Sequence, residues 1–213
     1  LGRNVSAIYV YPELETIFIH MPKCGGQSIQ NYFQSITNSK KQFHGHIPEE
    51  YRNYWKFTVV RNPADRLISA WTYCQKMHWF PKPRILPRWK TSSSLHRFLK
   101  LLEMWKTRPV SPINFGEFRE DPEFMTLHHA APMTHPDRCV DSLDYVGRFE
   151  VFPNVIEELS KRFGFKCDNQ HINRTDHADF RNYYDLSLKK KVNQYFAKDF
   201  SRFCYPLLKL EAD

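Results

Sequence analysis

The fold of this chain is indicated by residues 16–36, TIFIHMPKCGGQSIQNYFQSI. Residues 16–20 are almost entirely apolar, which predicts a strand that is buried on both faces. Pro22 and the Gly25-Gly26 pair predict a loop after it. The next apolar residues recur at offsets of 3, 4 and 7 positions, which is the spacing of one helix face; they are Ile29, Tyr32, Phe33 and Ile36. The stretch therefore predicts a strand, a loop and a helix in succession.

The same order of signals recurs further along the chain. Residues 57–60 form a short apolar run, and Pro63 stands where the first turn of a helix accepts proline. Leu67, Ile68 and Trp71 give the following segment an apolar face. Further strand or helix signals occur at residues 7–11, 143–149, 152–163 and 186–203. Two strand–loop–helix successions favour an α/β fold with a mostly parallel sheet.

The bulk properties are those of a globular protein of modest size. A chain of 213 residues fits a single domain, and we assign residues 1–213 to one. Residues 79–135 are interrupted by many prolines, with helical patterns at 95–105 and 123–130, and we interpret them as an irregular insertion beside a binding cleft. The net charge of +8 suits an anionic ligand, but lysine and arginine are not massed in a tail. We therefore expect no nucleic-acid partner, and no apolar run is long enough for a membrane span.

The loop between the first strand and helix has several features that favour anion binding. Backbone N–H groups and partial positive charge gather at a helix N-terminus. Lys23 adds a full charge, and Gln27 and Ser28 add side-chain donors. Gly25 and Gly26 allow the backbone to approach a ligand closely. The lysine precedes the glycines, so this is not the nucleotide-binding pattern GxxxxGK[ST]. A plain tight turn is the alternative interpretation of the glycine pair.

A second candidate pair follows the second strand. Arg61 ends that strand, and Ser69 lies eight residues later, in the second turn of the predicted helix. Helical side chains lean toward the helix N-terminus, so Ser69 is expected to reach back toward Arg61. A guanidinium binds phosphate with two hydrogen bonds. The alternatives are a surface ion pair for Arg61 and a neutral helix serine for Ser69.

Both motifs resemble those of a known family. HMPKCGGQSI (20–29) resembles the 5′-phosphosulfate loop of sulfotransferases that use 3′-phosphoadenosine 5′-phosphosulfate (PAPS), and TVVRNPADRLISAW (58–71) resembles their 3′-phosphate motif. The first motif is closest in style to the carbohydrate sulfotransferases, of the heparan sulfate 2-O type, and their bacterial relatives. DYVGRFE (144–150), NRT (173–175) and YFAKDFSRFCY (195–205) also resemble segments of that family.

This resemblance implies a P-loop-like, three-layer α/β fold with a central, mostly parallel sheet flanked by helices. It also implies transfer of a sulfuryl group from PAPS, leaving PAP as product and requiring no metal. The residues that it assigns to the 5′-phosphate and sulfate are Lys23, Cys24, Gly25, Gly26, Gln27 and Ser28. Arg61 and Ser69 are assigned to the 3′-phosphate, and Arg174 and Thr175 to a late loop over the nucleotide.

The resemblance also suggests a catalytic base. Transfer to a hydroxyl requires a group that removes its proton, and histidine suits this role near neutral pH. His44-Gly45-His46 resembles a segment of the heparan sulfate 2-O-sulfotransferases in which the second histidine is the base. We therefore predict His46 as base, Lys23 as the group that stabilises the leaving phosphate, and His44 as an acceptor contact. A metal site or an unremarkable surface pair are the alternatives for the two histidines. His128, His129 and His135 are further candidates for acceptor contact.

Other functions and compartments stay open at this point. The acceptor is predicted to be a glycan or another hydroxyl compound. A P-loop-like kinase or nucleotide hydrolase is one alternative, and a non-catalytic binder of anionic polymers is another. The five cysteines are odd in number and form no CxxC pair, which favours a reducing compartment. We therefore expect a cytoplasmic protein of bacterial type, with a truncated Golgi luminal domain as the alternative.

Overall fold

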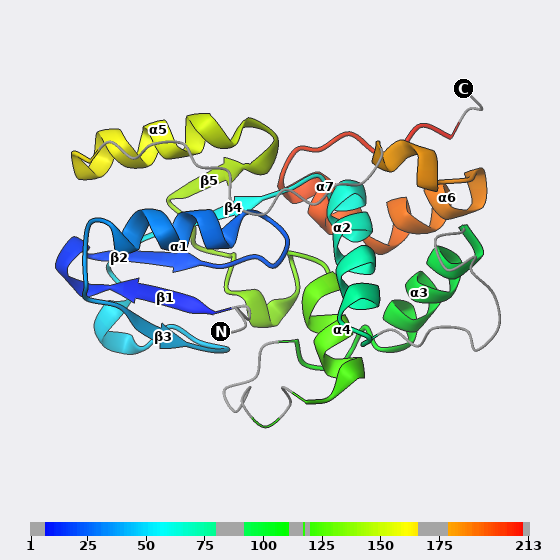
Figure 1. The fold of residues 1–213 in the computed structure, drawn as a ribbon, viewed down its shortest axis with the longest axis horizontal. Coiled ribbons are helices and arrows are strands. Elements are labelled where there is room, and N and C mark those ends of the chain that lie inside the picture. The colour runs from blue at the N-terminus through cyan, green and yellow to red at the C-terminus, as the bar shows by residue number, and fades with distance from the viewer. Residues whose placement is uncertain (1–6, 80–91, 111–116, 118–119, 166–178, 211–213) are drawn as a thin grey trace. The chain divides into compact units, whose positions relative to one another are not determined.

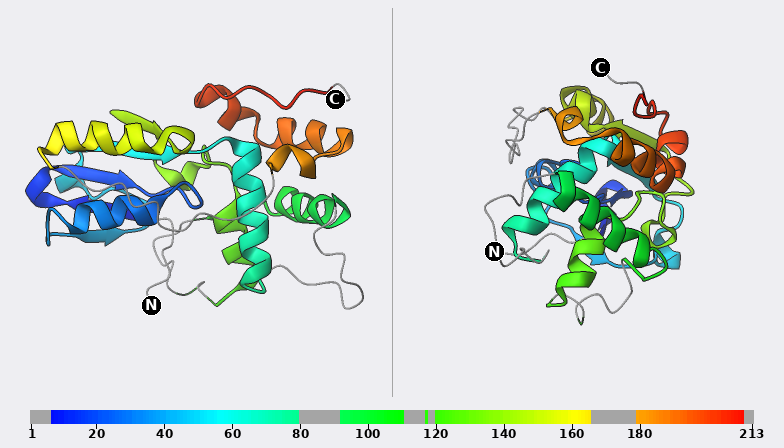
Figure 2. Two further views of the ribbon diagram at one scale, coloured as in Figure 1. Left: turned by 45° about the horizontal axis from the view of Figure 1, so that its top comes forward. Right: turned by 90° about the vertical axis from the view of Figure 1, so that its right-hand side faces the viewer.

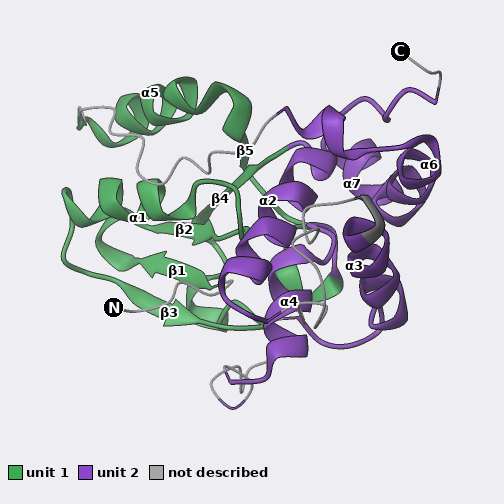
Figure 3. Ribbon diagram, turned by 45° about the vertical axis from the view of Figure 1, so that its right-hand side comes forward, with its two compact units in different colours: residues 1–61, 111–115, 136–174 green, residues 62–110, 116–135, 175–213 purple. Residues whose placement is uncertain are grey.

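The computed structural model describes residues 7–79, 92–110, 117, 120–165 and 179–210. These residues form two compact units (Figure 3). The first comprises residues 1–61, 111–115 and 136–174, and the second comprises residues 62–110, 116–135 and 175–213. Figures 1 and 2 show the elements of each. The assignment of the whole chain to one domain stays a prediction.

The first unit contains a five-stranded sheet. Its strands are β1 (Ile8–Tyr11), β2 (Thr16–Ile19), β3 (Lys41–Phe43), β4 (Trp55–Val60) and β5 (Tyr145–Arg148), in the order β3-β1-β2-β4-β5. β2 pairs with β4 and β4 with β5 in parallel, whereas β1 is antiparallel to both β2 and β3. β1 is therefore the one reversed strand, which agrees with the predicted mostly parallel α/β sheet. All residues of β1 and β2 are buried, as expected for the middle layer of such a fold.

Helices α1 (Gly26–Gln34) and α5 (Phe152–Phe163) pack on one face of this sheet. Phe33 of α1 contacts Phe57 of β4, with ring centroids 5.7 Å apart, and also Phe163 of α5 at 5.4 Å. Phe163 in turn meets Trp55 edge-on at 6.1 Å, at the start of β4. Gly164 ends α5 in the left-handed conformation that favours glycine. Aromatic side chains thus hold both helices to the strands.

The second unit is helical. Its helices are α2 (Pro63–Lys76), α3 (Ser92–Met104), α4 (Pro122–Ala130), α6 (Leu186–Tyr195) and α7 (Ala197–Arg202), with a short 3-10 turn η6 (Phe180–Tyr183). The helices predicted at 95–105 and 123–130 are confirmed as α3 and α4. The helix predicted at 186–203 is divided between α6 and α7 at Phe196.

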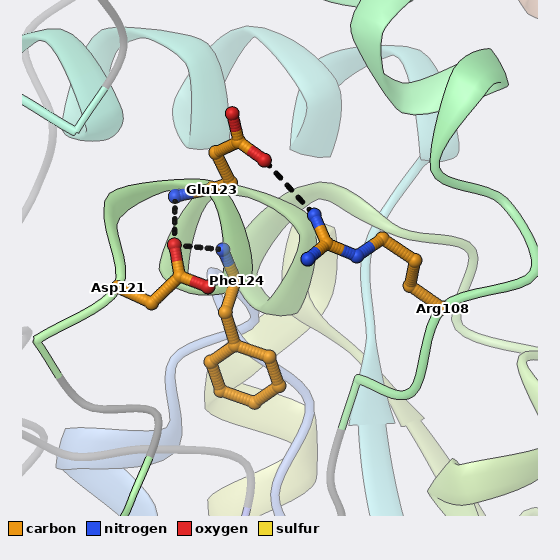
Figure 4. A network of polar contacts seen from close by, with 4 residues as sticks. All are labelled: Arg108, Asp121, Glu123 and Phe124. Atoms are coloured by element: carbon orange, nitrogen blue, oxygen red, sulfur yellow. Dashed lines mark hydrogen bonds and ion pairs between the residues drawn. The ribbon is translucent and has the colours of Figure 1, made fainter.

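The N-termini of α2 and α4 are capped by side chains. Asn62 accepts hydrogen bonds from the N–H groups at the start of α2, where Pro63 takes the predicted first position. Asp121 accepts the N–H groups of Glu123 and Phe124 at 2.9 Å and 3.3 Å, and Glu123 pairs with Arg108 at 3.0 Å (Figure 4).

Two buried charges fix the segment that follows α4. The fully buried guanidinium of Arg66 in α2 donates to the carbonyls of His129 and Ala131 at 3.1 Å and 2.8 Å. The fully buried carboxylate of Asp199 in α7 accepts the N–H groups of Met133 and Thr134 at 2.7 Å and 2.8 Å. A buried charge is tolerated when hydrogen bonds satisfy it, so these two charges hold residues 129–134 in one conformation.

Candidate functional site

Four segments leave the sheet of the first unit at one edge. One row of residues crosses three strands, because Ile8 of β1 pairs with Phe43 of β3 on one side and with Ile19 of β2 on the other. β2 and β3 both end at this row. β4 and β5 continue two residues further in the same direction. The segments that emerge here begin at His20, His44, Arg61 and Phe149. Ligands of open α/β sheets bind at the carboxyl ends of the strands, so the register gathers the first unit's candidate residues where a ligand is expected.

The loop after β2 has an unusual backbone. Lys23 adopts a left-handed conformation with φ of 68°, and Gly25 does so with φ of 80°. Between them, the buried Cys24 donates its N–H to the carbonyl of Met21 at 3.3 Å. Gly25 is the N-cap of α1, and its carbonyl accepts the N–H of Ser28 at 3.0 Å. The loop thus turns the chain from the end of β2 directly into α1.

This arrangement suits an anion. The first N–H groups of a helix have no acceptor inside it and carry partial positive charge, which applies here to Gly26 and Gln27. Lys23, which is half-exposed, adds a positively charged residue to the same loop. Ser28 is buried in the first turn, and the amide of Gln27 donates to Asn31 at 2.8 Å.

Both glycines are in close contact with aromatic rings. A Cβ at Gly26 would overlap Cδ2 and Nε2 of the buried His20, whose ring lies over this position. A Cβ at Gly25 would lie 2.8 Å from Phe152 and 3.2 Å from Phe149. The tight-turn alternative explains the left-handed Gly25, but it does not explain Gly26, where packing rather than backbone conformation excludes a side chain.

Arg61 joins this loop to the end of β4. It is only 6% exposed, and its Nη1 donates to the carbonyl of Lys23 at 3.3 Å. Its guanidinium carbon lies 4.5 Å from the centroid of the Phe149 ring. Thr58, on the same strand, donates its hydroxyl to the carbonyl of Ile19 at 2.7 Å and ties β4 to β2 just before the loop. The structure therefore brings the predicted Arg61 into contact with the predicted loop.

Ser69 lies in the second unit. It is fully buried in the second turn of α2, the position that the sequence predicted. Arg61 belongs to the first unit, so the pairing of these two residues at one phosphate stays a prediction.

The two predicted histidines follow β3, an edge strand that the sequence did not predict. His44 is half-buried and His46 is exposed, with Nδ1 of His46 3.3 Å from the carbonyl oxygen of His44. Gly45 between them is left-handed, with φ of 73°. Its carbonyl accepts the thiol of Cys139 at 3.7 Å, and burial raises the pKa of that thiol. One strand, β1, separates β3 from β2, so the histidine segment begins about 10 Å across the sheet edge from the loop.

The remaining candidates are placed differently. Arg174 and Thr175 lie outside the described residues. His128 and His129 are buried in α4, and their Nδ1 atoms lie against the carbonyls of Val110 and Met125. Both are thus part of the packing of the second unit, which corrects the expectation that they contact an acceptor.

In the described parts of the chain, no three His, Cys, Asp or Glu side chains gather in a way that could hold a metal ion. No helix in these same ranges is long and apolar enough to cross a bilayer.

Comparison with known proteins identifies the family. No curated protein and no solved structure matches the sequence significantly. A family model described as the sulfotransferase family matches residues 6–206, which is nearly the whole chain. The match includes the loop after β2, the histidine segment and Arg61, all at the same sheet edge. The chain therefore belongs to the sulfotransferase family.

Proposed function

We propose that this protein transfers the sulfuryl group of PAPS to a hydroxyl of a carbohydrate acceptor. One observation carries the proposal: the buried Arg61 contacts the loop at Lys23, at the edge where the strands of the sheet end. Arg61, Lys23 and the N-terminus of α1 thus belong to adjoining segments at this edge, which would suit a donor with several anionic groups. A kinase would require a different loop pattern and magnesium to bridge its phosphates.

The donor contacts follow from this arrangement. The loop from Lys23 to Ser28 would bind the 5′-phosphosulfate, with the N–H groups of Gly26 and Gln27 and the Lys23 ammonium as its donors. Arg61 would bind the 3′-phosphate together with Ser69. Arg174 and Thr175 are proposed to complete the nucleotide site on the basis of the family resemblance alone.

His46 is the proposed base. The acceptor oxygen forms a bond to sulfur as the bond between sulfur and the 5′-phosphate oxygen breaks, and His46 takes the acceptor's proton. The Lys23 ammonium stabilises the charge left on the phosphate. The exposed position of His46 supports this role, because it stands at the ligand edge of the sheet and is open to an incoming acceptor. His44, its half-buried neighbour, is proposed to contact the acceptor.

Calorimetric titration with PAP tests the donor site. The wild type should bind PAP, and both Lys23→Met and Arg61→Ala should weaken binding about tenfold or more, since a hydrogen bond to a charged group contributes about 1.5–3 kcal/mol. Lys198→Met removes an exposed lysine of α7 and serves as the matched control. ADP, which lacks the 3′-phosphate, should bind more weakly than PAP. A wild type with no measurable affinity for PAP would refute the donor assignment.

A separate experiment tests the base. His46→Ala should lower kcat by about 10²–10⁴-fold while PAP affinity stays unchanged. His78→Asn, at another exposed histidine, is the control and should leave kcat unchanged. Near-normal turnover by His46→Ala would remove His46 from the mechanism.

A screen of hydroxyl compounds with isotopically labelled PAPS, read by mass spectrometry, tests the acceptor class. Sulfated oligosaccharide products are expected, and sulfation of only lipids, small metabolites or tyrosine would overturn the carbohydrate assignment. Activity should persist in EDTA. Dependence on ATP and magnesium would favour the kinase alternative, and binding of polyanions without turnover would favour a non-catalytic binder. We also propose a reducing, cytoplasmic location, from the odd number of cysteines.

A further inference from the structure

Phe149 contacts two parts of the proposed donor site at once. It is the first residue after β5 and begins a single 3-10 turn, η5 (Phe149–Val151). The guanidinium of Arg61 lies over its ring, 4.5 Å from the centroid. The edge of the same ring lies against the backbone of Gly25, where a Cβ would come within 3.2 Å of Cδ2 and 3.3 Å of Cε2.

Arg61, Phe149 and the loop at residues 23–25 each contact the other two. Arg61 donates to the carbonyl of Lys23, two residues before Gly25, so its guanidinium lies in contact with both the loop and the ring. An aromatic face attracts a cation, and the attraction is stronger where water is excluded, as it is for the 6% exposed Arg61. The ring therefore restrains the guanidinium from one side while it packs against the loop with its edge.

We propose that Phe149 is a positioning residue for the sulfate donor. Its ring fixes Arg61 and the loop at Gly25 in one arrangement before the nucleotide binds. Without the ring, Arg61 would have to be ordered during binding, and this lost freedom would reduce affinity. The inference rests on the proposed function, because it takes Arg61 and the loop as the donor contacts.

The experiment compares PAP affinities by calorimetry and donor KM by kinetics. Phe149→Leu removes the aromatic face but keeps an apolar side chain, and should weaken PAP binding about tenfold. Donor KM should rise to the same extent, with kcat at saturating donor changed by less than about twofold. Phe149→Tyr keeps the ring and should restore affinity to within about twofold of the wild type. If Phe149→Leu does not fold, Phe149→Met provides the same loss of ring with a longer and more adaptable side chain.

Phe163→Leu is the matched control. It makes the same change on the same face of the sheet, but Phe163 packs on Trp55 at the opposite end of β4. It should lower the melting temperature and leave PAP affinity unchanged, which separates a structural role from a positioning role.

A double-mutant cycle with Arg61→Ala decides whether the ring acts through Arg61. Phe149→Leu should have a much smaller effect on PAP affinity in the Arg61→Ala background, where only the contact of the ring with Gly25 remains. Wild-type affinity in Phe149→Leu, or an equal loss in both backgrounds, would overturn the inference while leaving the donor site in place. Absence of PAP binding by the wild type would instead refute the donor site, and this inference with it.

Discussion

We expect Gly26→Ala to destabilise the protein, whereas helix propensity alone predicts that it stabilises the protein. Gly26 is the first residue of α1 and has no positive φ, so its backbone conformation suits any residue. In a helix, alanine is more favourable than glycine by about 1 kcal/mol. The structure opposes this gain, because the new Cβ would overlap Cδ2 and Nε2 of His20 and lie 3.0 Å from its Cγ.

The size of the effect follows from how firmly His20 is held. Its ring packs beside Phe18, with centroids 5.8 Å apart, and beside Tyr9 at 6.2 Å. Its backbone N–H donates to the carbonyl of Ala7 at 3.0 Å. Overpacking of a buried site costs about 1–3 kcal/mol, which exceeds the propensity gain over most of that range. A Cβ only 1.9 Å from Cδ2 and 2.1 Å from Nε2 calls for the upper part of this range, about 2–3 kcal/mol. After the propensity gain of about 1 kcal/mol is subtracted, we expect a net loss of about 1–2 kcal/mol, or a melting temperature lower by about 2–8 °C for a chain of this size.

Thermal and urea unfolding of four proteins test this reasoning: the wild type, Gly26→Ala, His20→Ala and the double variant. His20→Ala removes the ring that the Cβ would meet, so in that background Gly26→Ala should be neutral or stabilising. Gly164→Ala is a control of a different kind. Gly164 has φ of 72°, and among the described residues beyond its chain neighbours no atom lies within 4 Å of a new Cβ, so it measures the backbone penalty without a clash. The packing argument would be refuted if Gly26→Ala were as stable as the wild type. It would also be refuted if Gly26→Ala destabilised the protein equally with and without the His20 ring.

Four further predictions concern backbone strain, a buried acid and two titrating groups. Lys23→Gly should be more stable than Lys23→Ala by about 0.5–1 kcal/mol in urea unfolding, because only glycine relieves the left-handed strain, while both lose PAP affinity. Asp199→Ala should lower the unfolding free energy by about 3 kcal/mol, because it leaves three donors without an acceptor, and Asp199→Asn by less. The pKa of Asp185 is lowered, first by the N–H of Leu188. The part of its stabilisation that depends on charge is therefore present above the unfolded pKa of about 3.9 and is lost as the pH falls through the folded pKa, so Asp185→Ala should cost about 1 kcal/mol at pH 7 and less in acid, where the neutral carboxyl still accepts the N–H of Leu188. Burial raises the pKa of Tyr184 well above 10. The wild-type protein should therefore lose stability above pH 10, and Tyr184→Phe should lose less, as measured by circular dichroism over a range of pH.

The parts of the fold with strong local signals could be predicted from the sequence. The run at residues 16–20, the glycine pair and Pro63 each restrict the backbone within a few residues, and each element appears where it was predicted. Lys41–Phe43 carries no such signal. It becomes a strand only because it pairs with β1, a contact more than thirty residues away in sequence. Pairing of this kind has no local signature, so β3 was missed.

The residues of the candidate site also differ in whether the sequence alone could identify them. Lys23, Gly25, Gly26 and Arg61 could be identified from motifs, because their residue types carry the chemistry. The role of Phe149 could not, since phenylalanine in a strand-like run is ordinarily part of the core. Its position beside Arg61 depends on the neighbouring, parallel arrangement of β4 and β5, which follows only from the sheet order. The prediction for His128 and His129 was wrong for the opposite reason. Their residue type suggests catalysis, but both are buried and hydrogen-bonded parts of a helix.

Two independent features of the first unit select the same residues. The strand register alone brings the segments after β2 and β4 together at the ligand edge of the sheet. The backbone outliers alone point to residues 23–25, since Lys23 is held in a conformation that costs a residue with a Cβ about 1–2 kcal/mol. Glycine would remove that strain, but it would also remove the ammonium group. Strain of this kind persists where the surrounding structure enforces it, and here Arg61 binds the carbonyl of the strained residue itself. The strain and the buried cation therefore form one structure, and the anion site that we propose would account for both.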